Sequence, residues 1–315
     1  MTATQTPKRI RDVYGETLME LGERDERVVA VDADMASGTM TCGFQRRFPE
    51  RFFDVGIAEQ NLVNVGAGLA LGGHIPFVNT FAFLIALRAA EQVRTSVCWA
   101  NTNVKLAAGY GGVSGGMDGA SHCAVMDLAV MRSLPKLVVL SVSDGISARA
   151  ATLAAAEYEG PVYLRLSRAA APDVHPANFQ FRIGEGVSLR AGNDVTLVST
   201  GPVLSRCLQV AEELVRDGID ARVIEIHTLK PLDKELLVRA ACETGAIVTV
   251  EEHSIIGGLG SAVCEALAGT RPVPVVRVGF RDVFGETGPY EDLLGLAGLD
   301  LPGISAAVRQ ALELR

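Results

Sequence analysis

The feature that most constrains the fold is an alternation of short apolar runs with longer segments of helical periodicity. Parallel strands need a crossover connection, usually a helix, so this order predicts a parallel sheet with helices on both faces. In the first half, the predicted strands are 27–31, 77–78, 104–108, 137–141 and 162–166. The predicted helices are 13–23 (capped by Asp12), 59–73, 84–99, 124–132 and 146–158.

The alternation stops at residues 169–178 and then resumes. This segment, AAAPDVHPAN, has two prolines and no periodicity, which is typical of a linker. Beyond it, predicted strands at 194–199, 221–226, 246–250 and 273–278 alternate with helices at 203–217, 234–244 and 261–267. A chain of 315 residues can form two domains, each with its own core. We therefore expect an α/β protein of two domains, 1–182 and 183–315, each with a mostly parallel sheet flanked by helices.

Composition and charge exclude several classes of protein. Hydrophobic residues make up 48% and charged residues 21%, as in a soluble globular protein. The net charge of -8 disfavours nucleic-acid binding. The six cysteines have no zinc-ligand spacing, so we expect free thiols in a reducing cytoplasm. No apolar run suits a membrane span, and the N-terminal residues do not resemble a signal peptide.

Glu59 is the first candidate for chemistry, at the start of the helix predicted at 59–73. One interpretation is an acidic residue in a first helical turn, which the helix dipole favours. In the other, Gly56, Ile57, Ala58 and the apolar helix bury the side chain. A buried carboxyl group can exchange a proton near neutral pH. The pattern alone leaves both interpretations open.

A glycine-rich loop, residues 109–122, follows one predicted strand, and six of its fourteen residues are Gly. It matches neither the P-loop pattern nor the usual dinucleotide fingerprint. Loops after strands are where α/β sheets bind ligands. This loop carries Asp118 and His122, and a carboxylate four residues from an imidazole can orient it or share a proton with it. A flexible connection with a structural histidine is the alternative, and we favour the functional interpretation.

Two arginines flank predicted elements in positions that suit an anion. Arg168 follows the strand at 162–166, and Arg11 precedes the first helix. Guanidinium groups make paired hydrogen bonds with phosphate, sulfonate or carboxylate. Taken singly, each arginine is better explained as a surface charge.

Together these segments resemble the C-terminal half of a transketolase, and more closely the beta subunit of split, two-gene transketolases. The resemblance covers essentially the whole chain, including the EEHSIIGGLG segment at 251–260, which is similar to the C-terminal domain of this superfamily. The segments that carry the resemblance in the first half are DADMAS at 32–37, DVGIAEQN at 54–61, NTF at 79–81, MDGASH at 117–122 and LRLSR at 164–168.

The resemblance implies thiamine diphosphate as cofactor and assigns residues to its pyrimidine ring. Glu59 matches the glutamate that hydrogen-bonds N1′ and favours the imino tautomer, which removes the thiazolium C2 proton. Phe81 or Phe83 would stack on the ring, and Ile57 would also lie at the cofactor. The expected reaction is transfer of a two-carbon ketol unit from a ketose to an aldose.

The resemblance also assigns residues to the substrate. Asp118 and His122 match residues that contact the donor hydroxyls and assist proton transfer. Arg11, Arg168 and Ser37 match residues that hold a sugar phosphate. Many transketolases have a histidine in place of Tyr110 and an acidic residue in place of Met117. Tyr110 can donate a hydrogen bond but carries no charge, so the donor stays open among altered sugar phosphates, sulfo-sugars and other ketoses.

One family motif is absent from the chain. The Gly-Asp-Gly through which the family anchors Mg²⁺ and the diphosphate does not occur, and Mg²⁺ needs several oxygen ligands. We expect no metal ligands here. The resemblance implies that an N-terminal-type alpha subunit holds the ion, in an α2β2 enzyme with the cofactor at the subunit interface, and that this chain alone is inactive.

Three alternatives remain. The beta subunit of a 2-oxo-acid dehydrogenase shares the Tyr-Gly-Gly stretch at 110–112, although DGASH and the two arginines suit a sugar better. The second is a 1-deoxyxylulose-5-phosphate synthase-like fragment, and the third a non-catalytic partner. In the second domain we expect an assembly role and a structural His253. Cys123, beside His122, is a candidate to line the site.

Overall fold

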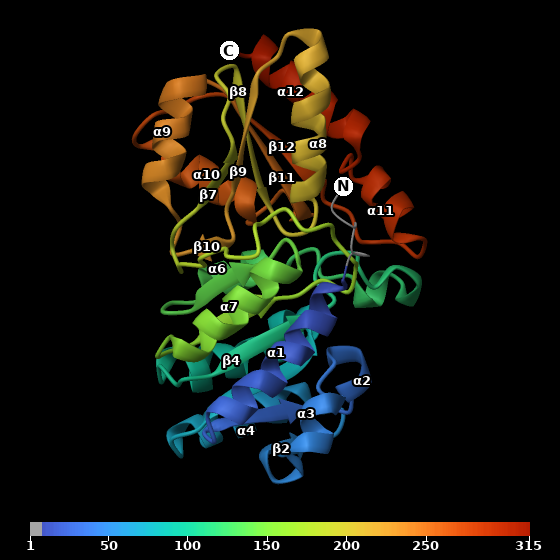
Figure 1. Cartoon of the computed structure of the whole chain (residues 1–315), viewed down its shortest axis with the longest axis vertical. Helices are drawn as coiled ribbons and strands as arrows, with labels where there is room; N and C mark the ends of the chain where they lie inside the picture. Colours follow the sequence, from blue (N-terminus) through green and yellow to red (C-terminus); the bar gives the residue numbers. More distant parts are fainter. Residues whose placement is uncertain (1–7) are drawn as a thin grey trace.

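The computed structural model describes residues 8–315, in which a larger sheet of seven strands lies below a smaller sheet of five in Figure 1. The larger sheet has the order β10–β5–β6–β4–β3–β1–β2, and all its neighbours are parallel except β10 and β5. Its strands are β1 (Val28–Asp32), β2 (Phe52–Asp54), β3 (Ile75–Phe81), β4 (Lys105–Gly109), β5 (Val138–Ser141), β6 (Val162–Arg165) and β10 (Thr228–Lys230).

Helices cover both faces of this sheet. On one face α1 packs against α7 and α3, and their apolar side chains form a core with β1 and β6. On the other face α4, α6 and the segments η2 and η3 pack together. The helices are α1 (Ile10–Arg24), α2 (Ala36–Thr39), α3 (Cys42–Arg47), α4 (Glu59–Leu71), α5 (Ala90–Gln92), α6 (Asp127–Ser133) and α7 (Gly145–Glu157), with short turns η1 (Pro49–Arg51), η4 (Gly116–Asp118) and η5 (Ala120–His122).

Three local predictions for these helices were wrong. Asp12 lies inside α1, because the helix begins at Ile10; Asp12 instead pairs with Arg9. The helix predicted at 84–99 is not continuous: wide π-helical turns, η2 (Leu84–Arg88) and η3 (Val93–Trp99), flank the short α5. The helix predicted from residue 124 begins only at Asp127.

The smaller sheet has the order β12–β11–β8–β9–β7, with only β7 antiparallel to its neighbour within the described residues. Helices α8, α11 and α12 form one apolar core with strands of this sheet. The apolar side chains of α9 and α10 belong to a different core, which also contains residues of the first half. The elements are β7 (Val187–Arg190), β8 (Val195–Thr200), α8 (Leu204–Leu214), η6 (Val215–Asp217), β9 (Ala221–Glu225), α9 (Lys234–Thr244), β11 (Ile247–Ser254), α10 (Leu259–Ala268), β12 (Val275–Phe280), α11 (Tyr290–Leu296) and α12 (Leu301–Glu313).

The fold class expected from the sequence is confirmed, although several elements were not predicted. Two α/β units with mostly parallel sheets are present. The strands that were not predicted are short or irregular, so their sequences show no clear alternation of apolar and polar residues. The missed elements are β2, β7 and β10, with the helices α2, α3, α11 and α12.

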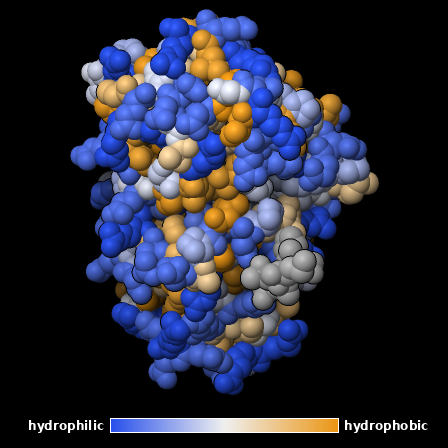
Figure 2. Space-filling model, turned by 45° about the horizontal axis from the view of Figure 1, so that its top comes forward, coloured by the Kyte–Doolittle hydropathy of each residue, from blue (hydrophilic) through white to orange (hydrophobic). Residues whose placement is uncertain are grey.

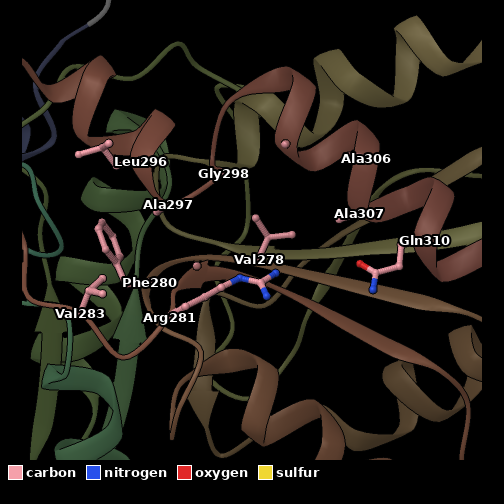
Figure 3. A pocket seen from close by; sticks show the side chains of 12 residues that line it. Val278, Phe280, Arg281, Val283, Leu296, Ala297, Gly298, Ala306, Ala307 and Gln310 are labelled. Atoms are coloured by element: carbon pink, nitrogen blue, oxygen red, sulfur yellow. The ribbon is translucent and has the colours of Figure 1, made fainter.

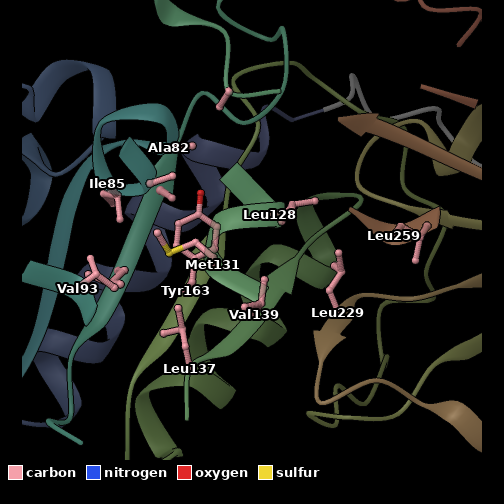
Figure 4. Packing of buried hydrophobic residues seen from close by; sticks show 14 of the residues in the cluster. Ala82, Ile85, Val93, Leu128, Met131, Leu137, Val139, Tyr163, Leu229 and Leu259 are labelled. Atoms are coloured by element: carbon pink, nitrogen blue, oxygen red, sulfur yellow. The ribbon is translucent and has the colours of Figure 1, made fainter. Parts of the chain in front are cut away.

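The two halves share one apolar core. β10, from the second half of the sequence, adds to the edge of the larger sheet beside β5. Figure 4 shows Leu229 and Leu259 of the second half in the same buried cluster as Leu128 and Val139 of the first. The predicted linker at 169–178 contains no helix or strand, but His175 within it is buried between the halves. This shared core fixes the orientation of the halves.

The outer surface is mainly polar. On the face drawn in Figure 2, hydrophilic residues predominate and apolar residues gather near the middle of the view. Within residues 8–315, no helix combines the length and the apolar character needed to cross a membrane. The N-terminal segment considered as a signal peptide falls partly on residues 1–7, outside the described residues.

Candidate active site

The candidate side chains gather at the carboxyl edge of the larger sheet. Four strands, β1, β3, β4 and β6, lie side by side in this order, and each is parallel to the next. Their carboxyl ends therefore meet at one edge, which is where ligands bind in open α/β sheets. The residues at or just beyond these ends are Ser37 after β1, Phe81 in β3, Tyr110 after β4 and Arg168 after β6.

Tyr110 lies between the two predicted arginines. Arg11 Nη1 donates to Tyr110 Oη at 3.0 Å and to the carbonyl of Gly38 at 3.1 Å, next to Ser37. The guanidinium carbons of Arg11 and Arg168 lie 5.6 and 5.0 Å from the centre of the tyrosine ring, within the range of cation–π attraction. The ring thus holds two cations close together, as an anionic ligand would require.

Arg11 retains hydrogen-bonding capacity. Its Nε is buried, lies 3.8 Å from Asp12 Oδ1, and makes no hydrogen bond within residues 8–315. A guanidinium group has five N–H donors, and a buried donor without a partner costs free energy.

Asp118 contacts Arg168 and not His122 in the described part of the chain. Arg168 Nη1 donates to Asp118 Oδ2 at 2.8 Å, and both side chains are more than a third exposed. His122 Nδ1 instead lies 3.1 Å from Ser121 Oγ. The expectation that the carboxylate orients the imidazole was therefore wrong, because η4 and η5 turn the two side chains toward different neighbours.

Aromatic rings connect these residues with the cofactor candidates. The ring centre of Phe81 lies 4.1 Å from that of Tyr110 and 5.7 Å from that of His122. The centres of Phe83 and His122 are 5.4 Å apart. Phe81 is buried, whereas Phe83 is partly exposed, so Phe83 has more surface to offer a flat ligand.

Glu59 is the first residue of α4, and its side chain is buried. Arg88 Nη1 donates to Glu59 Oε2 at 3.2 Å. Ile57, just before the helix, is 74% exposed. Sequence reasoning missed Arg88; the only signal was a basic residue shortly after the aromatic segment, in the helix predicted at 84–99.

Behind the site, a set of side chains that we call the buried polar cluster joins the halves. Arg165 Nε and Nη2 donate to the two carboxylate oxygens of Asp127 at 2.7 and 3.0 Å. Tyr163 Oη donates to Asp127 Oδ2 at 2.7 Å. Arg165 Nη2 also donates to the carbonyl of Glu252, at 3.1 Å. The cluster comprises Arg165, Asp127, Tyr163, Glu252 and Tyr290, and sequence reasoning did not identify it.

Some features lie apart from the site. A cavity of about 380 Å³ lies between β12 and the helices α11 and α12 and is lined by none of the candidate residues (Figure 3). His253 Nδ1 lies 2.7 Å from the carbonyl of Ser254, and its Nε2 accepts from the N–H of Ala129, in keeping with a structural role. Cys123 is buried behind the loop, next to Gly285.

Comparison with known proteins identifies the family. The model described as "Transketolase, pyrimidine binding domain" matches residues 7–173, and "Transketolase, C-terminal domain" matches residues 184–304. The chain is 40% identical over 304 residues to the 6-deoxy-6-sulfo-D-fructose transketolase subunit SqwH of Clostridium sp. (strain MSTE9), covering 96% of this chain and 94% of that protein. It is also 40% identical to 1-deoxy-D-xylulose-5-phosphate synthase 1 of Geobacter sulfurreducens, covering 96% of this chain but 48% of the synthase.

A solved structure agrees with this assignment. It is described as "Split gene transketolase, inactive beta4 tetramer", and it superimposes with a TM-score of 0.90 at 46% identity, covering 98% of this chain and 99% of the other. The family models together span most of the chain, and both the relative SqwH and this structure match it over nearly their whole length. The chain therefore belongs to the transketolase family, as a beta subunit of the split, heteromeric type.

Proposed function

We propose that this subunit, paired with an alpha subunit in an α2β2 enzyme, uses thiamine diphosphate to transfer a ketol unit from an anionic ketose to an aldose. The observation that carries the proposal is the presence, at one edge of the larger sheet, of a buried carboxylate and of two arginines with the Tyr110 ring between them. The cytoplasmic location expected from the sequence stays a prediction.

The residues near Glu59 fit the pyrimidine end of the cofactor. Arg88 donates to Glu59 Oε2, and within residues 8–315 Oε1 makes no hydrogen bond, so Oε1 would be able to share a proton with N1′ of the pyrimidine. Phe83, near His122, offers a partly exposed ring on which the pyrimidine would stack. When bound, thiamine diphosphate supplies the stabilisation of a carbanion.

The residues near Tyr110 suit the substrate. Arg11 and Arg168 would hold an anionic group of the ketose, with Ser37 on the adjoining turn. Asp118 and His122 would contact the donor hydroxyls, and His122 would move a proton there. The exposed ion pair of Arg168 and Asp118 can exchange partners when a substrate arrives, because such pairs contribute little to stability.

The residues do not fit a magnesium site. Within residues 8–315, no group of three or more His, Cys, Asp or Glu side chains could hold a metal ion. We propose that the alpha subunit holds Mg²⁺ and the diphosphate, and no step is assigned to the ion here.

The test is reconstitution with the N-terminal-type chain from the same genome. Each chain alone and the mixture are assayed with xylulose 5-phosphate, fructose 6-phosphate and 6-deoxy-6-sulfofructose as donors. We expect turnover only in the mixture, and a fall of about 10²–10⁴-fold with Glu59→Gln. Native mass spectrometry would show whether the complex is α2β2. Full activity of this chain alone would overturn the proposal.

The likeness to the synthase favours a second candidate, a 1-deoxyxylulose-5-phosphate synthase activity. The two differ in the donor: the synthase decarboxylates pyruvate, whereas a transketolase cleaves a ketose. The same reconstituted mixture is therefore given pyruvate and glyceraldehyde 3-phosphate. Carbon dioxide release without ketol transfer would replace the first proposal by the second.

A further inference from the structure

The EEHSIIGGLG segment has no role in the function proposed above, yet its two glutamates are both buried at the end of β11. Neighbouring residues on a strand point to opposite faces. Glu251 accepts from the N–H groups of Leu259 and Gly260 at 2.6 and 2.7 Å, so it anchors the start of α10 within the second half. Glu252 points away from α10, toward the glycine-rich loop.

Glu252 joins three segments that are far apart in the sequence. Its Oε1 accepts from the N–H of Val113 at 2.7 Å. Its Oε2 accepts from Tyr290 Oη at 2.8 Å. Its carbonyl accepts from Arg165 in β6. Both carboxylate oxygens are therefore used, one for the loop and one for α11.

The loop is shaped to receive this carboxylate. Gly112 has a φ of +66°, and a Cβ atom there would collide with the Glu252 side chain. Val113 lies three residues after Tyr110 and five before Asp118 in the sequence. The contact therefore lies between the residue that holds the two arginines and those proposed to touch the donor.

A second segment of the second half supports the other end of the loop. Residues 285–290 run against η4 and η5, where the N–H of Gly288 approaches the carbonyl of Gly116 at 3.5 Å. A Cβ at Gly119 would lie 2.7 Å from Thr287 Oγ1, and one at Gly285 would collide with Cys123. The glycine-rich loop thus rests on the second half along most of its length.

We propose that Glu252 is a positioning residue, which fixes the glycine-rich loop so that Tyr110, Asp118 and His122 are held in place for the ketose donor. This inference rests on the function proposed above. It gives the second half of the chain a role in substrate binding beyond assembly. Weakening the contact should release the loop and lower the affinity for the donor, while the cofactor side of the site stays intact.

The test compares Glu252→Gln with Glu251→Gln, a matched control in which the neighbouring buried glutamate is changed. A glutamine at 252 keeps the shape, but only its carbonyl oxygen can accept, so one of the two hydrogen bonds is lost. Tyr290→Phe is a milder variant that removes only the donor to Oε2. Assays at pH 8 keep the carboxylate ionised, because burial raises the pKa of Glu252 to about 7.

The first readout is amide hydrogen exchange of the full chain alone. We expect exchange across 110–122 to rise about tenfold in Glu252→Gln, with other segments unchanged. Glu251→Gln should instead affect α10. Unchanged exchange in the loop for both Glu252→Gln and Tyr290→Phe would overturn the proposal, whether or not the enzyme can be reconstituted.

The second readout is the kinetics of the reconstituted enzyme. We expect the KM for the ketose donor to rise about tenfold in Glu252→Gln with kcat within about twofold of the wild type. An equal rise in Glu251→Gln would mean a general structural effect and would overturn the proposal. Absence of ketol transfer by the wild-type pair would count against the proposed function alone, since the exchange experiment still tests the loop contact.

Discussion

Two ion pairs, whose arginines lie three residues apart along the chain, differ in exposure and in the number of hydrogen bonds that they share. Arg168 and Asp118, at the carboxyl edge of the larger sheet, are 38% and 39% exposed and share one hydrogen bond. Arg165 and Asp127, in the buried polar cluster, are 4% and 0% exposed and share two. Arg165 makes further hydrogen bonds with the carbonyls of Ala124 and Glu252, so most of its donors are already used.

The difference comes from where each arginine sits relative to β6. Tyr163 and Arg165 lie two residues apart on the strand, so both face α6 and meet Asp127. Arg168 lies beyond the end of the strand, where the chain turns into the solvent-facing edge. Separating an exposed ion pair costs little free energy, so a ligand can take the place of one partner. Separating a buried pair costs much more, because it leaves a charge without a partner and without solvent. The comparison therefore separates a pair suited to binding from a pair suited to joining the halves.

We expect the largest loss of stability when the buried pair of Arg165 and Asp127 is broken. Asp127→Asn removes the carboxylate that is hydrogen-bonded to the buried Arg165 guanidinium, and we expect the free energy of unfolding to fall by about 3–5 kcal/mol. The matched change at the edge, Asp118→Asn, should lower it by less than about 1 kcal/mol. Urea denaturation of both variants checks this, and equal losses would show that burial does not distinguish the pairs.

A second buried group of charged side chains, centred on His175, should make the stability of the fold depend on pH. His175 Nδ1 and Nε2 lie 2.9 and 2.8 Å from Asp144 Oδ2 and Glu225 Oε2, and these carboxylates, acting against burial, raise the pKa of His175 to about 9. Its stabilising contribution is therefore full below about pH 6.5, the pKa of an unfolded histidine, and is lost as the pH rises through 9.

The measurement is the difference in unfolding free energy between the wild type and His175→Gln from pH 6 to 10. We expect this difference to shrink by up to about 3 kcal/mol over that range. The difference is needed because Lys105, whose pKa burial lowers to about 7, acts in the opposite direction in both proteins. A difference that does not change with pH would mean that the pKa of His175 is the same in the folded and the unfolded chain, which would contradict its rise in the fold.

The exposed arginine should affect binding but not folding. In the reconstituted enzyme, Arg168→Gln should raise the KM for an anionic ketose about tenfold, because one charge-assisted contact is lost. Its unfolding curve should match that of the wild type. Arg182→Gln, which changes a surface arginine paired with Glu185, serves as the control. An unchanged KM in Arg168→Gln would remove this residue from the substrate site.

The smallest expected effect is at the start of α1. Arg9 Nε lies 2.8 Å from Asp12 Oδ2 on the surface, and the pair spans one helical turn. Arg9→Ala should lower the free energy of unfolding by no more than about 0.5 kcal/mol. A loss as large as that of Asp127→Asn, measured in the same denaturation experiment, would contradict the distinction between surface and buried pairs.

Much of the fold could be predicted because its signals are local. The alternation of strands and helices, the start of α4 at Glu59 and the position of the glycine-rich loop all follow from neighbouring residues. The short strands β2 and β10 escaped prediction because three residues carry no usable period. The prediction of a continuous helix at 84–99 was wrong for a related reason. The spacing of apolar residues does not reveal where a helix widens into π-helical turns.

The sequence by itself determined the two α/β halves, the order of candidate residues along the chain and the resemblance to split transketolases. Only the tertiary structure decided the partner of each charged side chain. Asp118 pairs with Arg168, Asp127 pairs with Arg165, and Glu252 accepts a hydrogen bond from a backbone amide 139 residues away. The physical reason is that helical and strand periods depend on residues a few positions apart. Burial and hydrogen-bond partners depend on how separate elements pack, and no local pattern encodes that.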